Sequence, residues 1–227
     1  MADALAAPAA GRVAAVAGAS GLVGRCLIER LCADPAVAEV HALVRRPLPL
    51  AHPRLRCHVV DVAALPALPP LDEVYLALGT TIKTAGSQAA FRAVDFNANL
   101  AVAQAALAAG ARRAGLVSAL GASARSSVFY SRVKGELEDA LAALPFEALV
   151  IARPSMLHGD RHALGQPVRR GELLWARMEA VLRPIVPRRL RAIAAADVAA
   201  ALARAVPAAR GREVLDSSAM QGAAASS

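Results

Sequence analysis

One stretch of this chain, Val13 to Leu31, constrains the fold more than any other. It reads V-A-A-V-A-G-A-S-G-L-V-G-R-C-L-I-E-R-L, which is an apolar run, then three spaced glycines, then apolar residues at helical intervals. The apolar run is typical of a buried parallel strand, and the last part is typical of a helix with one apolar face. A strand, a glycine turn and a helix in this order predict the start of a βαβ unit.

The spacing of the three glycines has a chemical explanation. Gly18 permits a tight turn off the strand, Gly21 lets a phosphate approach the backbone because it has no Cβ, and Gly24 lets the helix pack close to the sheet. The free N–H groups and the positive dipole end of the helix N-terminus favour a pyrophosphate. A strand-to-helix turn without a ligand explains one glycine well and three poorly, so the stretch predicts a dinucleotide site. The residues expected to form it are Gly18, Ala19, Ser20, Gly21, Leu22, Val23 and Gly24.

Apolar runs and helical patterns alternate along the rest of the chain. Strands are expected at 39–44, 55–60, 73–78, 114–117 and 148–152, and helices at 89–109 and 128–144. This alternation predicts the α/β class, with a doubly wound parallel sheet of the Rossmann type, right-handed crossovers and strand order 3-2-1-4-5-6.

Beyond residue 154 the pattern is looser and predicts a small helical and loop appendage. The expected elements are a loop at 158–171, a helix at 172–182 that carries Trp175, a helix at 197–206 and an edge strand at 213–215. A further loop is expected at 82–87, where the residues are polar and include a glycine. We expect one domain over 1–216, which begins with a short loose leader and is followed by a disordered tail at 217–227.

The composition restricts the environment of the protein. Because 56% of its 227 residues are hydrophobic, the chain can build a large core without disulfides, and its three cysteines form no C-x-x-C pair. This usage favours a reducing compartment, so a cytoplasmic location is expected. No uncharged apolar run reaches the roughly 18 residues of a membrane span, so no membrane association is expected.

The distribution of arginines and histidines argues against nucleic-acid binding and against a metal site. The net charge is +8, but the arginines are scattered in pairs without interleaved aromatic residues, which argues against nucleic acid. His158, Asp160 and His162 lie close in sequence, yet a loop with no third histidine nearby is a poor metal site. We therefore expect a small molecule as the partner and no metal. The sequence does not predict the oligomeric state.

Ligands in open parallel sheets bind beyond the carboxyl ends of the strands, so the residues that follow the expected strands should surround one crevice. Arg45 and Arg46 follow the second strand, where an acidic residue usually meets the ribose 2′-hydroxyl of NAD. A guanidinium fork suits a 2′-phosphate, so NADP is favoured over NAD, the alternative being two solvated arginines before a turn. Asp61 and Val62 follow the third strand and are expected beside the adenine.

Tyr130 and Lys134, in Y-S-R-V-K, lie one turn apart on the same face of an expected helix. The tyrosine can protonate a reacting carbonyl oxygen, and the lysine can hold ribose hydroxyls while its charge favours the tyrosinate form. The alternative is an exposed tyrosine and lysine on a surface helix. Asp95, Asn97 and Asn99, on the preceding helix, either border the active site or are polar positions on a helix face, and the second interpretation is favoured.

Several short motifs make the chain resemble one family. They are G-A-S-G-L-V-G at 18–24, L-V-R-R at 43–46, D-V at 61–62, A-L-G-T-T at 77–81, V-S-A-L-G-A at 117–122, F-Y-S-R-V-K-G-E at 129–136 and R-P-S-M-L-H-G at 153–159. Together they resemble the atypical short-chain dehydrogenases/reductases, near the Tat-interacting-protein-like NAD(P)H-binding group. The resemblance covers residues 12–206 and implies NADPH bound along the glycine turn, with Tyr130 and Lys134 at its nicotinamide end. It also implies cofactor contacts from Leu78, Gly79, Thr80, Ser118, Pro154, Met156 and Leu157.

The chain departs from this family at the serine that short-chain reductases place after the fifth strand to orient the substrate carbonyl. Relatives often carry consecutive serines there. This chain has Ser118 followed by Ala119 and Leu120, with Ser123 as a substitute from the loop. The departure bears on catalysis and leaves cofactor binding unaffected.

The primary interpretation is an NADPH-dependent oxidoreductase that transfers a hydride to a small carbonyl or enone. Tyr130 would be the acid, Lys134 its tuner and a ribose ligand, and Ser118 the orienting residue. An alternative of another class is a redox sensor that holds NADPH but turns over little, which the missing serine pair favours. A second alternative is a sugar-nucleotide epimerase or dehydratase, although the stretch after Pro154 is short for the substrate lobe of such enzymes.

Overall fold

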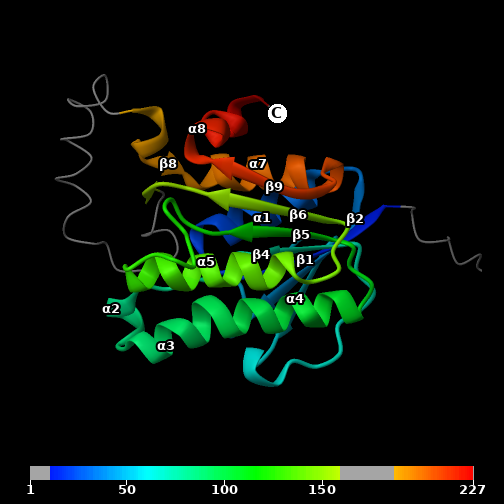
Figure 1. The fold of residues 1–227 in the computed structure, drawn as a ribbon. Helices are drawn as coiled ribbons and strands as arrows, with labels where there is room; N and C mark the ends of the chain where they lie inside the picture. The colour runs from blue at the N-terminus through cyan, green and yellow to red at the C-terminus, as the bar shows by residue number, and fades with distance from the viewer. Residues whose placement is uncertain (1–10, 159–186, 227) are drawn as a thin grey trace, which may run out of the picture.

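The computed structural model describes residues 11–158 and 187–226, which contain one sheet of seven parallel strands (Figure 1). The strand order is β3-β2-β1-β4-β5-β6-β9, so the predicted order 3-2-1-4-5-6 is confirmed and an edge strand is added to it. The strands are β1 (Arg12–Ala17), β2 (Val37–Val44), β3 (Leu55–Val59), β4 (Glu73–Leu76), β5 (Arg113–Val117), β6 (Ala148–Arg153) and β9 (Gly211–Asp216).

Helices cover both faces of the sheet (Figure 1). α1 (Leu22–Ala33) and α7 (Ala195–Ala208) lie on one face, and α4 (Asn99–Ala108) and α5 (Phe129–Ala142) lie on the other. Each face has its own cluster of buried apolar side chains, so the sheet is the middle of three layers. Strands buried on both faces read as unbroken apolar runs, which explains the sequence of β1.

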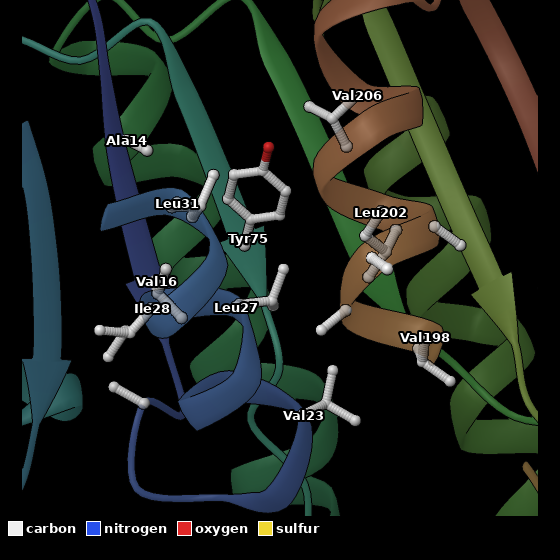
Figure 2. Packing of buried hydrophobic residues seen from close by; sticks show 14 of the residues in the cluster. Ala14, Val16, Val23, Leu27, Ile28, Leu31, Tyr75, Val198, Leu202 and Val206 are labelled. Carbon is white, nitrogen blue, oxygen red and sulfur yellow. The ribbon is translucent and has the colours of Figure 1, made fainter. Parts of the chain in front are cut away.

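Small residues let the helices approach the sheet closely. Leu27 and Leu31 of α1 and Leu202 of α7 lie around Tyr75 in one core cluster (Figure 2). Gly115 in β5 lies beneath α7, where a Cβ would come 2.8 Å from Val206 Cγ2. This position of β5 therefore requires glycine, and the alanine-rich composition of α7 belongs to the same close packing.

The long helix predicted at 89–109 is present, but it is not a regular α-helix throughout. It consists of α3 (Gln88–Arg92), a π-helical turn η2 (Ala93–Ala98) and then α4, without a break between them. A π-turn inside an α-helix is rare and is frequently found at functional sites. This turn is the part of the helix that carries Asp95.

The loop predicted at 82–87 is wrong in its first part, because Ile82–Ala85 form the short helix α2. The Oγ1 atom of Thr81 accepts a hydrogen bond from Thr84 N at 3.1 Å and so caps the start of this helix. Threonine is a favourable residue at that capping position. The polar composition of the segment concealed this capping pattern.

The C-terminal residues form a helical segment instead of the disordered tail predicted at 217–227. α8 (Ser217–Met220) follows β9, and a 3-10 turn η4 (Ala223–Ser226) follows α8. Asp216 caps α8, and Met220 is completely buried. One cap and one apolar anchor thus order a segment whose composition indicates disorder, and the folded unit includes it.

The appendage after β6 includes a small parallel sheet that the sequence did not predict. It pairs β7 (Leu157–His158) with β8 (Ile193–Ala194), and the 3-10 turn η3 (Arg188–Leu190) precedes β8. The leader, the loop predicted at 158–171 except for its first residue, and the helix predicted at 172–182 with Trp175 lie outside the described residues. None of the helices in the described part of the chain has the length and apolar character that crossing a membrane requires.

Candidate functional site

The turn between β1 and α1 requires glycine at two positions for the fold itself. Gly18 has a φ of +82°, and a Cβ there would lie 2.4 Å from the carbonyl oxygen of Ala77. A Cβ on Gly24 would lie 2.2 Å from the carbonyl oxygen of Gly18. Gly21 differs, because its φ is −83° and its Cβ would stay 3.2 Å from the nearest atom. Backbone packing therefore requires glycine at positions 18 and 24. It does not require glycine at position 21, where the missing side chain leaves space for a ligand.

The other residues of this turn fall into two groups. Ala19 and Val23 are buried in the core, so they offer only their backbone to a ligand. Ser20 is exposed and Leu22 is half-buried. α1 begins after Gly21 with no side-chain cap and no acidic residue in its first turn. Its first N–H groups are thus available to an anion, which fits the pyrophosphate expected from the sequence.

The glycine turn gives a first testable prediction. Gly21→Val is expected to abolish binding of NADPH in a calorimetric titration while the thermal midpoint of the ligand-free protein shifts little, because a Cβ at this position meets no severe clash. Gly24→Ala is expected to lower the midpoint itself, because its Cβ would overlap a backbone oxygen. A ligand-free Gly21→Val protein that unfolds like Gly24→Ala would mean that Gly21 serves packing alone.

Beside this turn, the ends of β2 and β3 bring four predicted site residues to the same edge of the sheet. Val44 pairs with Val59 at the end of the two strands, and Arg45 and Arg46 follow the first of them, both exposed. Asp61 follows β3 and is exposed, and the half-buried Val62 begins the 3-10 turn η1 (Val62–Ala64). These four residues thus follow two neighbouring strands at the same edge of the sheet.

Lys134 is buried in an ion pair at the end of β4. Its Nζ lies 2.8 Å from Asp95 Oδ1, and the side chains of the two residues are 5% and 0% exposed. Asp95 Oδ2 accepts a hydrogen bond from Thr80 N at 2.9 Å, and Asn99 Nδ2 donates to the carbonyl oxygen of Leu78 at 3.1 Å. A Cβ on Gly79 would lie 3.9 Å from Lys134 Nζ. The lysine is therefore held against the segment that the resemblance assigned to the cofactor.

Asp95 and Asn99 are not solvent-facing polar positions of the helix, and of the two interpretations of these residues the one that places them at the border of the site fits better. Both are completely buried, whereas Asn97 is exposed. Their spacing held the necessary clue, because Phe91, Asp95 and Asn99 recur at intervals of four and so share one helix face. A carboxylate and an amide on the apolar face of a helix indicate buried partners.

Tyr130 lies one turn before Lys134 on α5, beside an open cavity of about 290 Å³. Its ring is half-buried and packs at 5.5 Å from the ring of Phe91, measured between centroids. Of the cofactor residues expected after β6, Pro154 and Met156 line this cavity, while Leu157 is half-buried in β7. The complete described lining is Ala119, Leu120, Tyr130, Pro154, Ser155, Met156 and Leu190.

Ser118 is not among the residues that line this cavity. It is buried, and its hydroxyl donates a 2.5 Å hydrogen bond to Glu138 Oε1. Glu138 is itself buried and forms ion pairs with Arg153 and Arg212. Arg153 donates hydrogen bonds to the Glu138 carboxylate, which raises the pKa of the Arg153 guanidinium above its usual value. Tyr130 and Lys134 thus lie one turn apart on α5, whereas the Ser118 hydroxyl belongs to a separate network with Glu138.

The substitute serine is also separate from the cavity beside Tyr130. Ser123 is exposed and lines a second cavity, of about 460 Å³, together with Glu138 and Arg153. The residue that follows β5 and does line the first cavity is Ala119. The side chain that follows Ser118 and reaches this cavity is therefore a methyl group.

Comparison with known proteins identifies the family. Residues 18–208 match a family described as NAD(P)H-binding. A relative from Candida albicans, named Protein FMP52, mitochondrial, is 32% identical over 184 residues, which cover 75% of this chain and 80% of the relative. The name of this relative states neither a substrate nor a reaction.

Solved structures share the fold. The complex of MoeE5 with UDP-glucose and NAD superposes with a TM-score of 0.67 at 22% identity, over 90% of this chain and 75% of that one. An oxidoreductase of the short-chain dehydrogenase/reductase family from Burkholderia thailandensis superposes with a TM-score of 0.64 at 20% identity, over 92% and 93% of the two chains.

The comparisons also correct the expected location. The cytoplasmic location predicted from the cysteines is contradicted by the relatives, several of which carry the word mitochondrial in their names. Unpaired cysteines report the redox state of a compartment and do not identify the compartment.

The matched family, the strand order and the glycine turn all agree with the resemblance drawn from the sequence motifs. The chain therefore belongs to the NAD(P)H-binding family, and it has the Rossmann-type fold of the solved structures.

Proposed function

We propose that this oxidoreductase-like protein reduces a small carbonyl or enone with NADPH. The observation that supports this most is the arrangement on α5, where Tyr130 borders an open cavity and Lys134 is fixed one turn away by Asp95. A proton donor beside a cavity, next to a cation that faces the expected cofactor segment, is the geometry that carbonyl reduction needs.

The residues of the glycine turn fit a dinucleotide. Gly21 has room for a phosphate, and the uncapped start of α1 directs N–H groups toward it. Lys134 would hold the ribose hydroxyls at the nicotinamide end, close to Gly79. When bound there, the reduced nicotinamide would supply the hydride for the substrate carbon and would itself be oxidised to NADP⁺.

The proton in this scheme comes from the chain. As the hydride adds to the carbonyl carbon, the carbonyl π-bond breaks and its electron pair forms the new O–H bond with the proton of the Tyr130 hydroxyl. The product is an alcohol, and solvent returns a proton to the tyrosinate. In this scheme Lys134 would face the tyrosinate with its positive charge, and the ion pair with Asp95 keeps the ammonium in place.

A second candidate function, an NADPH-binding sensor that turns over little, is favoured by the same cavity. Ala119 offers a methyl group where an orienting hydroxyl is expected, and Ser118 is committed to Glu138. The two candidates share the cofactor site and differ in whether a bound carbonyl reacts.

The loss of reduced-nicotinamide absorbance with a panel of aldehydes, ketones and enones decides between the candidates. Turnover above the rate without a carbonyl supports the reductase. Ala119→Ser should then raise the rate by roughly two- to tenfold, because one added hydrogen bond to the carbonyl is worth about 0.5–1.5 kcal/mol. NADPH binding without turnover in either protein would support the sensor.

Cofactor preference gives a separate prediction. Changing both Arg45 and Arg46 to alanine is expected to weaken NADPH binding by about 1.5–3 kcal/mol, because charge-assisted hydrogen bonds to the 2′-phosphate are lost. NADH lacks that phosphate, so its affinity should hardly change. Calorimetric titration with both cofactors measures this difference. Equal losses for NADH and NADPH would show that the two arginines do not read the 2′-phosphate.

A further inference from the structure

The cavity beside Tyr130 has an apolar wall. Five of the described residues that line it are Ala119, Leu120, Pro154, Met156 and Leu190. Leu120, Met156 and Leu190 are 37%, 51% and 50% exposed, which is unusual for large apolar side chains gathered around one opening. None of the described lining residues is charged at neutral pH.

The two polar side chains in the described lining have different tasks. The Ser155 hydroxyl donates to the carbonyl oxygen of Arg191 and lies 2.9 Å from the hydroxyl of Ser217, so it already has its partners. Ser217 is completely buried. Tyr130 is thus the side chain through which this lining can meet a polar atom of a substrate.

The size and chemistry of the wall limit what can bind. A volume of about 290 Å³ is near the lower end of the range of roughly 300–1,000 Å³ that ligand pockets occupy. A charged group placed against this wall would lose part of its hydration, and none of the described lining residues offers it an opposite charge, which is unfavourable. A hydrocarbon or aromatic group would gain from leaving water.

We propose that this cavity accepts uncharged carbonyl compounds with a small hydrocarbon or aromatic substituent, and that Leu190 helps to exclude charged ones. The proposal rests on the proposed reductase function for its reacting group. The carbonyl oxygen lies toward Tyr130 and the apolar substituent lies against Met156 and Leu190. Hydride and proton are supplied by NADPH and Tyr130, as described above.

A matched pair of aldehydes tests the proposal. Para-methylbenzaldehyde and para-carboxybenzaldehyde carry the same reacting group, and they differ in whether the distal substituent is apolar or anionic. With the NADPH-saturated wild-type protein, we expect kcat/KM to be about tenfold higher for the methyl compound, because the carboxylate meets no charged side chain among the described lining residues. Equal values, or a preference for the carboxylate, would overturn the proposal.

A charge placed on the wall gives the sharper test. Leu190→Lys is expected to raise kcat/KM for the carboxylate compound by roughly two- to fivefold, the size of a half-exposed ion pair, and to lower it for the methyl compound. Val214→Lys is the matched control, because Val214 is also exposed, at 43%, and does not belong to the described lining. The same gain in both variants would reflect net charge and would overturn the role of Leu190.

Binding of the product alcohols separates this proposal from the proposed function. Calorimetry with para-methylbenzyl alcohol and para-(hydroxymethyl)benzoate, added to the NADPH-saturated protein, measures the preference of the cavity without requiring turnover. Tighter binding of the methyl compound, reversed or reduced in Leu190→Lys, would support the cavity assignment even if neither aldehyde is reduced. Turnover without any preference in binding or kinetics would contradict the cavity assignment and leave the reductase function standing.

Discussion

Replacing Tyr130 by phenylalanine is expected to lower the rate of NADPH oxidation with an accepted carbonyl by about 10²–10⁴-fold, the range that general acid catalysis contributes. The change removes the hydroxyl and keeps the ring that packs on Phe91. The affinity for NADPH and the thermal midpoint should therefore stay close to those of the wild-type protein. Steady-state kinetics and calorimetric titration of the same preparation measure all three quantities.

Tyr75 provides the control for this experiment, because it is the other tyrosine of the chain. It is completely buried, and its hydroxyl donates to Glu73 Oε1 at 3.1 Å in the core. Tyr75→Phe should lower stability and leave the rate per folded molecule unchanged. If activity survives in Tyr130→Phe, the proton comes from another group and the assignment of Tyr130 as the acid is wrong.

Removing the carboxylate of Asp95 is expected to destabilise the protein by about 3–5 kcal/mol, because it leaves the buried ammonium of Lys134 without its partner. The hydrogen bond from Thr80 N is lost as well. Urea denaturation of Asp95→Ala measures the change in the free energy of unfolding. Glu29→Ala is the control, since it removes an exposed ion pair with Arg25 and should change stability by about 0.5 kcal/mol or less.

A double variant tests whether the unpaired charge is the cause. Asp95→Ala combined with Lys134→Met removes both charges, and it should recover much of the stability lost in the single variant. An additive loss in the double variant would instead indicate that the packing of the π-helical turn matters and that the ion pair contributes little.

The frame of this fold could be predicted because local patterns coincide with it. The apolar run predicts β1, the three glycines predict the glycine turn, and the helical pattern after them predicts α1. The alternation of elements along the chain then predicts the strand order. Tyr130 and Lys134 could be paired in advance because helical spacing alone puts them on one face. Each of these inferences needs only residues that are near one another in sequence.

The parts that could not be predicted depend on contacts between distant segments. The side chain of Ser118 reaches Glu138 from the end of β5, whereas the next residue, Ala119, lines the cavity. Successive residues of an extended chain point to opposite sides, so one position decides between the network and the cavity. The sequence alone does not say which side a residue at the end of a strand takes.

The C-terminal segment shows a different limit. Its small polar residues indicate disorder by composition, yet the cap on α8 at Asp216 and the buried Met220 order it. The free energy gained by burying one apolar side chain depends on whether the fold removes that side chain from water. For Met220 that place is made by the core cluster it shares with α7, which sequence patterns near the segment do not reveal.

The π-helical turn at Ala93–Ala98 makes the position of Asp95 in the site depend on the number of residues in this helix. Such a turn accommodates an extra residue, and deletion of one residue would convert it to regular α-helix. Side chains before and after the turn would keep their faces of the helix, whereas those inside it, Asp95 among them, would rotate to another face. Asp95 and Asn99 could no longer face Lys134 and the carbonyl of Leu78 together. A relative that keeps the aspartate but lacks one residue in this turn would therefore hold its lysine differently, and a single gap in an alignment would mark that difference.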